Sequence, residues 1–326
     1  METTEIKNSN IQPETTEITG FIKNIQDFIK DYPYEIALVV VIIGVILYKV
    51  VSEKNISLRS KEDIPKIIWI YWNTPIEKAP EIVQISIQLI QKFNPTFQIK
   101  ILNQENYKEY VTDKIIIQLM NSKLSLNFKS DLLRFYLLYN YGGIYSDASI
   151  LPLQSFDWVV DKLKGSNNDV FFYKNIHHTT NQNEPICESW FIGSYKGNNI
   201  IKILLDNFIK SLINGIDKSY KELINDKDVD YQNFITHGPY HLVYFVMINA
   251  LSKNKLHPYI IYENCSYNKY PCKYFHNHYN INELYHKSIT QEELNDIQDQ
   301  KLIKLTGTNR KYIDYYKLKI KENNLL

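Results

Sequence analysis

The feature that most constrains the fold is a strand–helix–strand pattern in the first third of the chain. Pro65 and Pro75 bound a short apolar run over residues 66–72, which predicts a buried strand. Residues 81–93 carry apolar side chains at helical spacing, and residues 97–102 predict a second strand. A strand, a helix and a strand in this order open a parallel α/β sheet, so an α/β fold is expected.

A second unit follows, in which a helix reverses into a strand. Residues 130–141 predict a mostly apolar helix, which Gly142 and Gly143 end. Residues 144–151 then predict a strand that carries polar side chains. Further strands are expected at 170–173 and 190–192, and further helices at 198–212 and 239–251.

Polar side chains of this unit are expected to converge. Asp131 and Arg134 are three residues apart and therefore share a helix face. Tyr145, Asp147 and Ser149 alternate along the predicted strand and point to one side. Singly, each has an ordinary structural explanation, such as a helix cap or a solvated ion pair. Together, at the end of a strand in an α/β sheet, they indicate a ligand site.

The N-terminal region predicts a membrane anchor. Residues 1–33 read as a polar tail and an amphipathic helix, and residues 34–51 contain an uncharged run from 36 to 48. The segment 34–51 has about the ~17–20 residues that a membrane-spanning helix needs. Residues 52–63 are expected to form a stem, and residues 64–326 the folded domain.

A single-pass membrane protein is therefore expected, with its orientation left open. Basic residues that follow the span mildly favour a cytoplasmic C-terminal domain. Glycosylation sequons at Asn55 and Asn264 matter only if that domain is lumenal.

Composition excludes several functional classes. The chain has 37 lysines and arginines against 36 aspartates and glutamates, so no strong field draws it to nucleic acid. Its sequence contains no Gly-rich phosphate loop and no zinc-spaced cysteine and histidine set. Cys265 and Cys272 could pair if the domain lies in an oxidising compartment, but three free thiols, including Cys187, are expected.

The segment from Lys129 to Ser149 resembles the signature of glycosyltransferases with a DXD-type sugar-binding region. The similarity is to the capsular polysaccharide synthesis type, related to initiating α-mannosyltransferases and large glucosylating toxins. Residues 64–72, 190–193 and 236–239 resemble further parts of the family, so the resemblance covers roughly residues 64–251. It implies a GT-A type nucleotide-diphospho-sugar transferase fold with a mixed central sheet. The implied activity is that of a retaining hexosyltransferase.

The resemblance also implies roles for individual residues. Catalytic roles are implied for Asp131, Arg134 and Asp147. Donor-binding residues are expected to be Trp69, Tyr71, Ser130, Tyr145 and Lys304, with the first two beside the base. Acceptor contacts are expected from Trp190, His237 and Gly238.

The resemblance further implies a divalent cation, Mn²⁺ or Mg²⁺, held by Asp147 and Ser149. The second aspartate of the DXD motif is replaced by Ser149, whose neutral hydroxyl is a weaker ligand for a hard cation. This departure leaves the dependence on metal open.

The expected function is therefore transfer of a sugar from a UDP- or GDP-sugar to a glycan or protein hydroxyl acceptor, in polysaccharide biosynthesis. The alternative is a catalytically degenerate, membrane-tethered sugar-binding or scaffold protein, which the Ser149 departure supports. A nucleotidyltransferase or phosphosugar enzyme would need a basic cluster around Asp147, and the sequence offers none there.

Overall fold

The computed structural model describes residues 64–265 and 300–305. The chain divides into two compact units, 1–60 and 61–326, and the described residues belong to the second. The predicted tail, membrane span and stem lie outside the described residues. Among the helices that the structure does describe, none is both long and apolar enough to cross a membrane.

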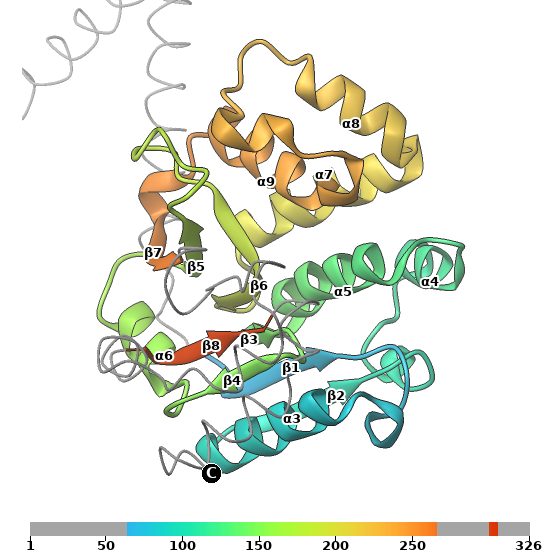
Figure 1. Ribbon diagram of the computed structural model, residues 1–326, viewed down its shortest axis with the longest axis vertical. Coiled ribbons are helices and arrows are strands. Elements are labelled where there is room, and N and C mark those ends of the chain that lie inside the picture. Colours follow the sequence, from blue (N-terminus) through green and yellow to red (C-terminus); the bar gives the residue numbers. More distant parts are fainter. Residues whose placement is uncertain (1–63, 266–299, 306–326) are drawn as a thin grey trace, which may run out of the picture. The chain divides into compact units, whose positions relative to one another are not determined.

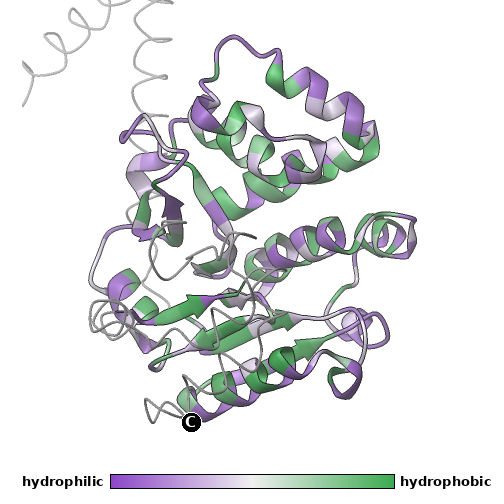
Figure 2. Ribbon diagram, in the orientation of Figure 1, coloured by the Kyte–Doolittle hydropathy of each residue, from purple (hydrophilic) through white to green (hydrophobic). Residues whose placement is uncertain are grey.

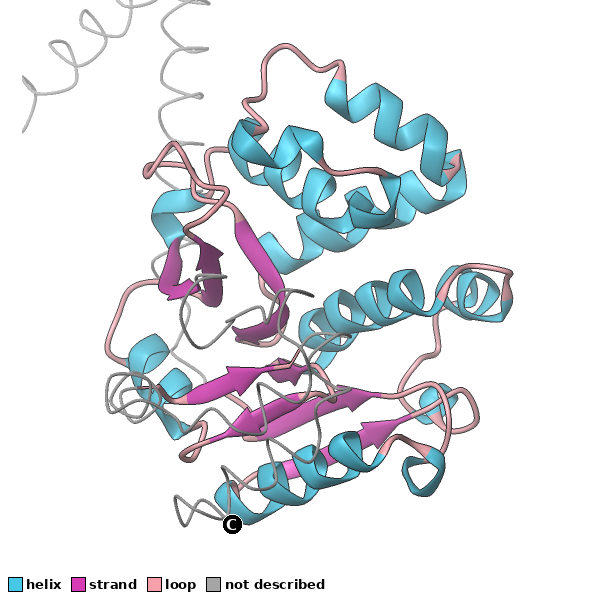
Figure 3. Ribbon diagram, viewed as in Figure 1, coloured by secondary structure: helices cyan, strands magenta, loops and turns pink. Residues whose placement is uncertain are grey.

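A six-stranded mixed sheet forms the centre of the domain (Figure 3). Its spatial order is β2 (Gln98–Leu102), β1 (Ile67–Tyr71), β3 (Gly143–Ser146), β6 (Cys187–Ser194), β5 (Val170–Asn175) and β7 (Ile260–Cys265). Strand β6 runs antiparallel to both of its neighbours, whereas β1 pairs in parallel with β2 and β3, and β5 with β7. The expected α/β fold with a mixed central sheet is confirmed.

Helices cover both faces of this sheet (Figure 1). One face carries α3 (Glu81–Phe93), α6 (Asp157–Lys164) and a small second sheet of β4 (Ile150–Pro152) and β8 (Leu302–Lys304). The other carries α4 (Lys114–Asn121), α5 (Leu126–Tyr141), α7 (Asn199–Asn214) and α9 (Leu242–Lys253), with α8 (Ile216–Ile224) packed on α7 and α9. Short 3₁₀ turns lie at Ile76–Lys78, Tyr107–Glu109, Gln232–Thr236, Pro239–His241 and His257–Tyr259.

Strand β1 shows how the two cores divide the apolar residues. Ile68 and Ile70 pack into the core under α3, and Trp69 and Tyr71 pack into the core under α5. Successive side chains of a strand point to opposite faces, and both faces here are covered. Four of the five residues of β1 are accordingly buried, while the helices alternate in hydropathy (Figure 2).

The reversal from α5 into β3 needs both of its glycines. Gly142 and Gly143 have φ angles of +69° and +94°. A Cβ atom on Gly142 would lie 2.6 Å from the backbone nitrogen of Lys196, and one on Gly143 would lie 2.5 Å from the carbonyl oxygen of Ile67. No other residue fits this turn without displacing backbone, so the expected end of the helix is confirmed.

The strand expected over residues 144–151 is not continuous, which corrects the prediction. Strand β3 ends at Ser146, a turn follows, and β4 begins at Ile150 in the small second sheet. Tyr145, Asp147 and Ser149 therefore do not share one face of one strand.

The cysteines also differ from expectation. Cys265 is disulfide-bonded, and its partner lies outside the described residues. Cys187 is free and buried in β6. The expectation of three free thiols is wrong.

Candidate active site

The candidate site lies at the edge of the sheet where β1 and β3 end and β6 begins. Asp147 is the first residue after β3, and its backbone N–H donates to the carbonyl oxygen of Trp190 in β6 (2.9 Å). The parallel strands β1 and β3 direct their carboxyl ends to this edge. Open α/β sheets bind ligands at such an edge.

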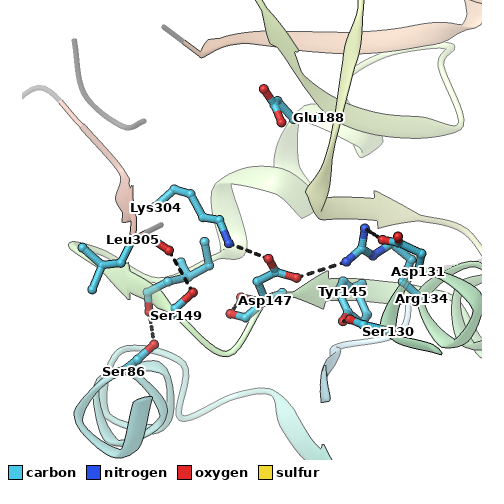
Figure 4. Close-up of polar contacts among 12 residues, drawn as sticks. Ser86, Ser130, Asp131, Arg134, Tyr145, Asp147, Ser149, Glu188, Lys304 and Leu305 are labelled. Carbon is cyan, nitrogen blue, oxygen red and sulfur yellow. Dashed lines mark hydrogen bonds and ion pairs between the residues drawn. The ribbon is translucent and has the colours of Figure 1, made fainter. Parts of the chain in front are cut away.

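Asp147 lies between two cations. Its Oδ1 accepts a hydrogen bond from Arg134 Nη2 (3.1 Å), and its Oδ2 accepts one from Lys304 Nζ (2.5 Å). Figure 4 shows the two cations approaching from opposite sides, Arg134 from α5 and Lys304 from β8. The exposed fractions of the side chains are 4% for Arg134, 25% for Asp147 and 14% for Lys304. The Lys304 side is thus the more open one.

Arg134 is bound on its inner side by Asp131, one helical turn earlier. Its Nη1 donates to Asp131 Oδ1 at 2.5 Å, and both side chains are buried. Burial raises the pKa of Asp131 to about 6, which the charge of Arg134 opposes and that of Asp147 adds to. Burial alone would lower the pKa of Arg134, but Asp131 and its other neighbours raise it above its usual range. The guanidinium therefore stays charged between two carboxylates.

Tyr145 supports this guanidinium from the sheet. Its ring lies under Arg134, with the guanidinium carbon 4.8 Å from the ring centroid, and its hydroxyl shares a hydrogen bond with Ser130 (2.7 Å). Burial raises the pKa of Tyr145 to about 12, so the phenol stays protonated. Tyr145 and Ser130 were expected to bind the donor. In the structure they hold Arg134 in position, and Tyr145 is fully buried.

The two aromatic residues expected beside the base have different surroundings. Trp69 is only 1% exposed, and its indole N–H donates to the carbonyl oxygen of Gly142 (2.9 Å). Its ring packs against Tyr110 and Tyr141 in the core, so it offers no face to a base, which corrects the expectation. Tyr71 ends β1 at the site edge, and its hydroxyl hydrogen-bonds the side chain of Gln104 (3.3 Å).

Ser149, expected to be a metal ligand, is instead part of the contact between β4 and β8. Its hydroxyl donates to the carbonyl oxygen of Leu305 (3.0 Å), and the Leu305 N–H donates back to the Ser149 carbonyl oxygen (3.0 Å). The residue is 5% exposed. Across the described ranges, no three histidine, cysteine or acidic residues are grouped to hold a metal ion. With both Asp147 oxygens bound to cations, this donor set does not fit a divalent cation.

Of the residues expected to contact the acceptor, Trp190 lies beside Lys304, whereas His237 belongs to a separate cluster. Trp190 stacks on Tyr173 (4.8 Å between centroids), and the Lys304 ammonium lies 5.9 Å from its ring. His237 lies in a separate cluster, with its Nε2 3.3 Å from His178 Nε2, and Gly238 follows it at the surface.

Sequence reasoning missed Glu188, two residues before Trp190 on β6. The carboxylate is buried and accepts hydrogen bonds from Asn175 Nδ2 (2.8 Å) and from the hydroxyl of Tyr244 (2.8 Å). Figure 4 shows it apart from the Asp147 group. A lone carboxylate just before the apolar run at residues 190–192 was the available signal.

Residues 23–306 match the family described as capsular polysaccharide synthesis protein. The match spans most of the chain, and the chain belongs to this family. Membership supports a glycosyltransferase activity, in agreement with the resemblance of the segment from Lys129 to Ser149. No curated protein matches the chain significantly.

Three solved structures are similar to the chain at low identity. The PaToxG glycosyltransferase is 17% identical over 59% of this chain and 70% of its own, with a TM-score of 0.37. The catalytic domain of α-toxin from Clostridium novyi is 11% identical over 78% and 87%, with a TM-score of 0.36. The ligand-free glycosyltransferase domain of the YGT toxin is 10% identical over 72% and 88%, with a TM-score of 0.42. Because these identities and TM-scores are low, the similarities do not determine the function of this chain.

Proposed function

We propose that this chain is a membrane-anchored GT-A type glycosyltransferase that moves a hexose from a UDP- or GDP-sugar to a glycan or protein hydroxyl. The observation that carries the proposal is the chain of alternating charges from Asp131 through Arg134 and Asp147 to Lys304 at the edge of the sheet. Capsular polysaccharide synthesis, the description of the family, requires transfer of sugars and supports this reaction.

The diphosphate of the donor needs positive partners. Arg134 and Lys304 both converge on Asp147, and charge-assisted hydrogen bonds to phosphate are about twice as strong as neutral ones. Lys304 has two ammonium protons beyond the one given to Asp147, and these are available to phosphate oxygens. As the leaving group departs, Lys304 stabilises the negative charge that develops on its phosphate.

The sugar needs hydrogen-bond acceptors, which the carboxylates supply. Asp131 gives one oxygen to Arg134 and retains lone pairs for sugar hydroxyls. Its pKa of about 6 means that it is ionised near neutral pH, when it accepts hydrogen bonds and stabilises positive charge on the sugar. Asp147 would meet the ribose or the sugar, and its partial exposure supports this.

We propose that transfer retains the anomeric configuration through attack on the front face. The bond between the anomeric carbon and the phosphate oxygen breaks, and a bond to the acceptor oxygen forms on the same side. The acceptor proton passes to the departing phosphate. This route needs no carboxylate nucleophile, which suits a site where Asp131 and Asp147 are both already paired with cations. The anomer of the product, measured by NMR, tests retention.

The anchor and its orientation complete the proposal. Residues 34–51 would span the membrane once, and the acceptor would meet Trp190 beside Lys304. The disulfide of Cys265 favours an oxidising compartment for the domain, against the weak bias of the flanking basic residues. Glycosidase-sensitive modification of Asn264, exposed beside that cysteine on β7, would support a lumenal domain.

The test is a thermal-shift screen of the full-length protein against UDP- and GDP-sugars, with and without Mn²⁺, followed by donor hydrolysis without acceptor. A transferase is stabilised by one nucleotide class and slowly releases nucleoside diphosphate. Stabilisation by a sugar nucleotide without any release would favour the sugar-binding or scaffold alternative. No stabilisation by any donor and no release would contradict the proposal.

A further inference from the structure

We infer that the ammonium group of Lys304 takes the place of a divalent cation in the donor site, so that sugar transfer by this chain is independent of metal. The inference rests on the proposed function and assigns the charge that the diphosphate meets. It follows from where the chain puts Lys304, Asp147 and Ser149.

A metal in this site would depend on the carboxylate of Asp147. Asp147 Oδ2 accepts from Lys304 and Oδ1 accepts from Arg134. A hard cation held by one aspartate needs direct contact with a carboxylate oxygen, and it needs further oxygen ligands beside it. Lys304 lies at hydrogen-bond distance from Asp147 Oδ2, and its side chain is more exposed than that of Arg134.

Ser149, the other expected metal ligand, is bound elsewhere. The Ser149 hydroxyl donates to Leu305, the residue immediately after Lys304, and the two residues also share a backbone hydrogen bond. Ser149 is thereby buried between the two strands. The pairing of β4 with β8 therefore positions Lys304 beside Asp147 and also occupies the Ser149 hydroxyl. A single contact between strands accounts for both arrangements.

Lys304 is held in position by strand pairing. It ends β8, where it is the partner of Ile150 in the antiparallel pairing with β4. Its ammonium lies 5.9 Å from the ring of Trp190, and its side chain is 14% exposed. A partly desolvated ammonium held by strand pairing interacts more strongly with a phosphate than a free surface lysine does.

A lysine site and a metal site should respond differently to salt and to chelators. The Lys304 ammonium carries a single charge and also donates to Asp147, so binding of the diphosphate depends on this one ammonium group. Donor binding is then expected to weaken as ionic strength rises and to be unaffected by chelators.

The experiment uses the full-length protein, with donor hydrolysis measured in EDTA and in Mn²⁺, and with binding of UDP and GDP measured by calorimetry in EDTA. Wild-type protein is expected to bind one nucleotide and to turn over the donor at the same rate in both buffers. In Lys304→Gln, the rate of donor hydrolysis is expected to fall on the order of 100-fold, as when a group that stabilises transition-state charge is removed.

Lys301→Gln is the matched control. Lys301 lies three residues earlier and pairs with Glu263 (3.3 Å), so its removal should leave turnover within about twofold of wild type.

A second readout does not depend on activity. In titrations with Mn²⁺ followed by electron paramagnetic resonance, wild type and Asp147→Asn are expected to bind the same amount of Mn²⁺. Turnover only with Mn²⁺, or a Mn²⁺ site lost in Asp147→Asn, would overturn the inference and leave the glycosyltransferase proposal standing. Absence of nucleotide binding and turnover in both buffers would instead overturn the proposed function, and the inference with it.

Discussion

The two sides of Asp147 are built differently. On the α5 side, Arg134 is buried, paired with Asp131 and stacked on Tyr145. On the β8 side, Lys304 is partly exposed and reaches Asp147 from a strand that lies 157 residues away in the sequence. The first cation is fixed by the folding of one helix and its neighbouring strand, and the second by a non-local strand pairing.

The difference indicates that Arg134 contributes mainly to folding and Lys304 mainly to ligand binding. A buried guanidinium between two carboxylates is costly to disturb, because removing it leaves uncompensated charges away from water. A partly exposed ammonium is cheaper to replace, so it contributes more to ligand binding than to folding. Four substitutions or titrations test this division, from the largest expected effect on stability to the smallest.

Arg134→Ala should have the largest effect. It leaves Asp131 and Asp147 without their shared cation, and the free energy of unfolding should fall by about 3–5 kcal/mol. Urea unfolding measures this change. Lys202→Ala removes an exposed pair with Asp206 and should cost about 0.5 kcal/mol. Equal effects for the two variants would show that the Arg134 side is not the buried anchor.

Gly143→Ala should disturb the reversal that carries α5 into β3. The new Cβ meets the carbonyl oxygen of Ile67 at 2.5 Å, and the φ angle is +94°, so a loss of about 3–4 kcal/mol is expected. Gly197→Ala is the control, because its φ is also positive at +68° but nothing lies within 4 Å of the added atom. It should cost about 1 kcal/mol. A similar loss of stability at both positions would mean that the positive φ angle, and not the close approach of the Ile67 carbonyl oxygen, determines the cost of the substitution.

Asp131 should make stability depend on pH. Burial raises its pKa in the folded state from 3.8 to about 6. The folded state then binds the proton more tightly, so this contribution is complete below the unfolded pKa and is lost as pH rises towards and through about 6. The loss amounts to about 3 kcal/mol between pH 3.8 and 6.

Unfolding of wild type and Asp131→Asn from pH 4 to 7 checks this, because the variant should lack that pH dependence. Parallel curves for the two proteins would contradict the titration. Donor turnover should show the opposite trend and fall as pH drops below about 6, because the protonated Asp131 loses the negative charge that stabilises the sugar.

Lys304→Met should have the smallest effect on folding and a large effect on function. The partly exposed pair with Asp147 should contribute about 1 kcal/mol or less to stability. Nucleotide affinity should nevertheless fall at least tenfold, measured by calorimetry. A large destabilisation with unchanged affinity would reverse the roles assigned to the two sides.

The contrast between local folding and non-local strand pairing also explains which features of the structure the sequence predicts. The helix over residues 81–93, the apolar strand β1 and the reversal at Gly142 depend on local pattern, and the structure confirms them. The convergence of Asp131, Arg134 and Asp147 also follows from this local unit. Periodicity is informative wherever the partner of an element is its neighbour in the sequence.

Features that depend on distant partners were not predicted. The break between β3 and β4 arises because residues 150–152 pair with β8, which no local pattern specifies. That pairing also decides that Ser149 donates to Leu305. Trp69 illustrates a second limit, because alternation along β1 does not reveal which face meets the α5 core. Glu188 was missed because its partners Asn175 and Tyr244 come from other elements.

The most direct test of the central claim is donor hydrolysis by Asp147→Asn, compared with wild type and with Asp157→Asn. Asp157 pairs with Lys66 at the surface, so its replacement controls for loss of a carboxylate elsewhere. Release of nucleoside diphosphate should fall by on the order of 100-fold or more in Asp147→Asn, with a melting temperature close to that of wild type. Retained release together with normal melting would contradict the assignment and place the active site elsewhere in the chain.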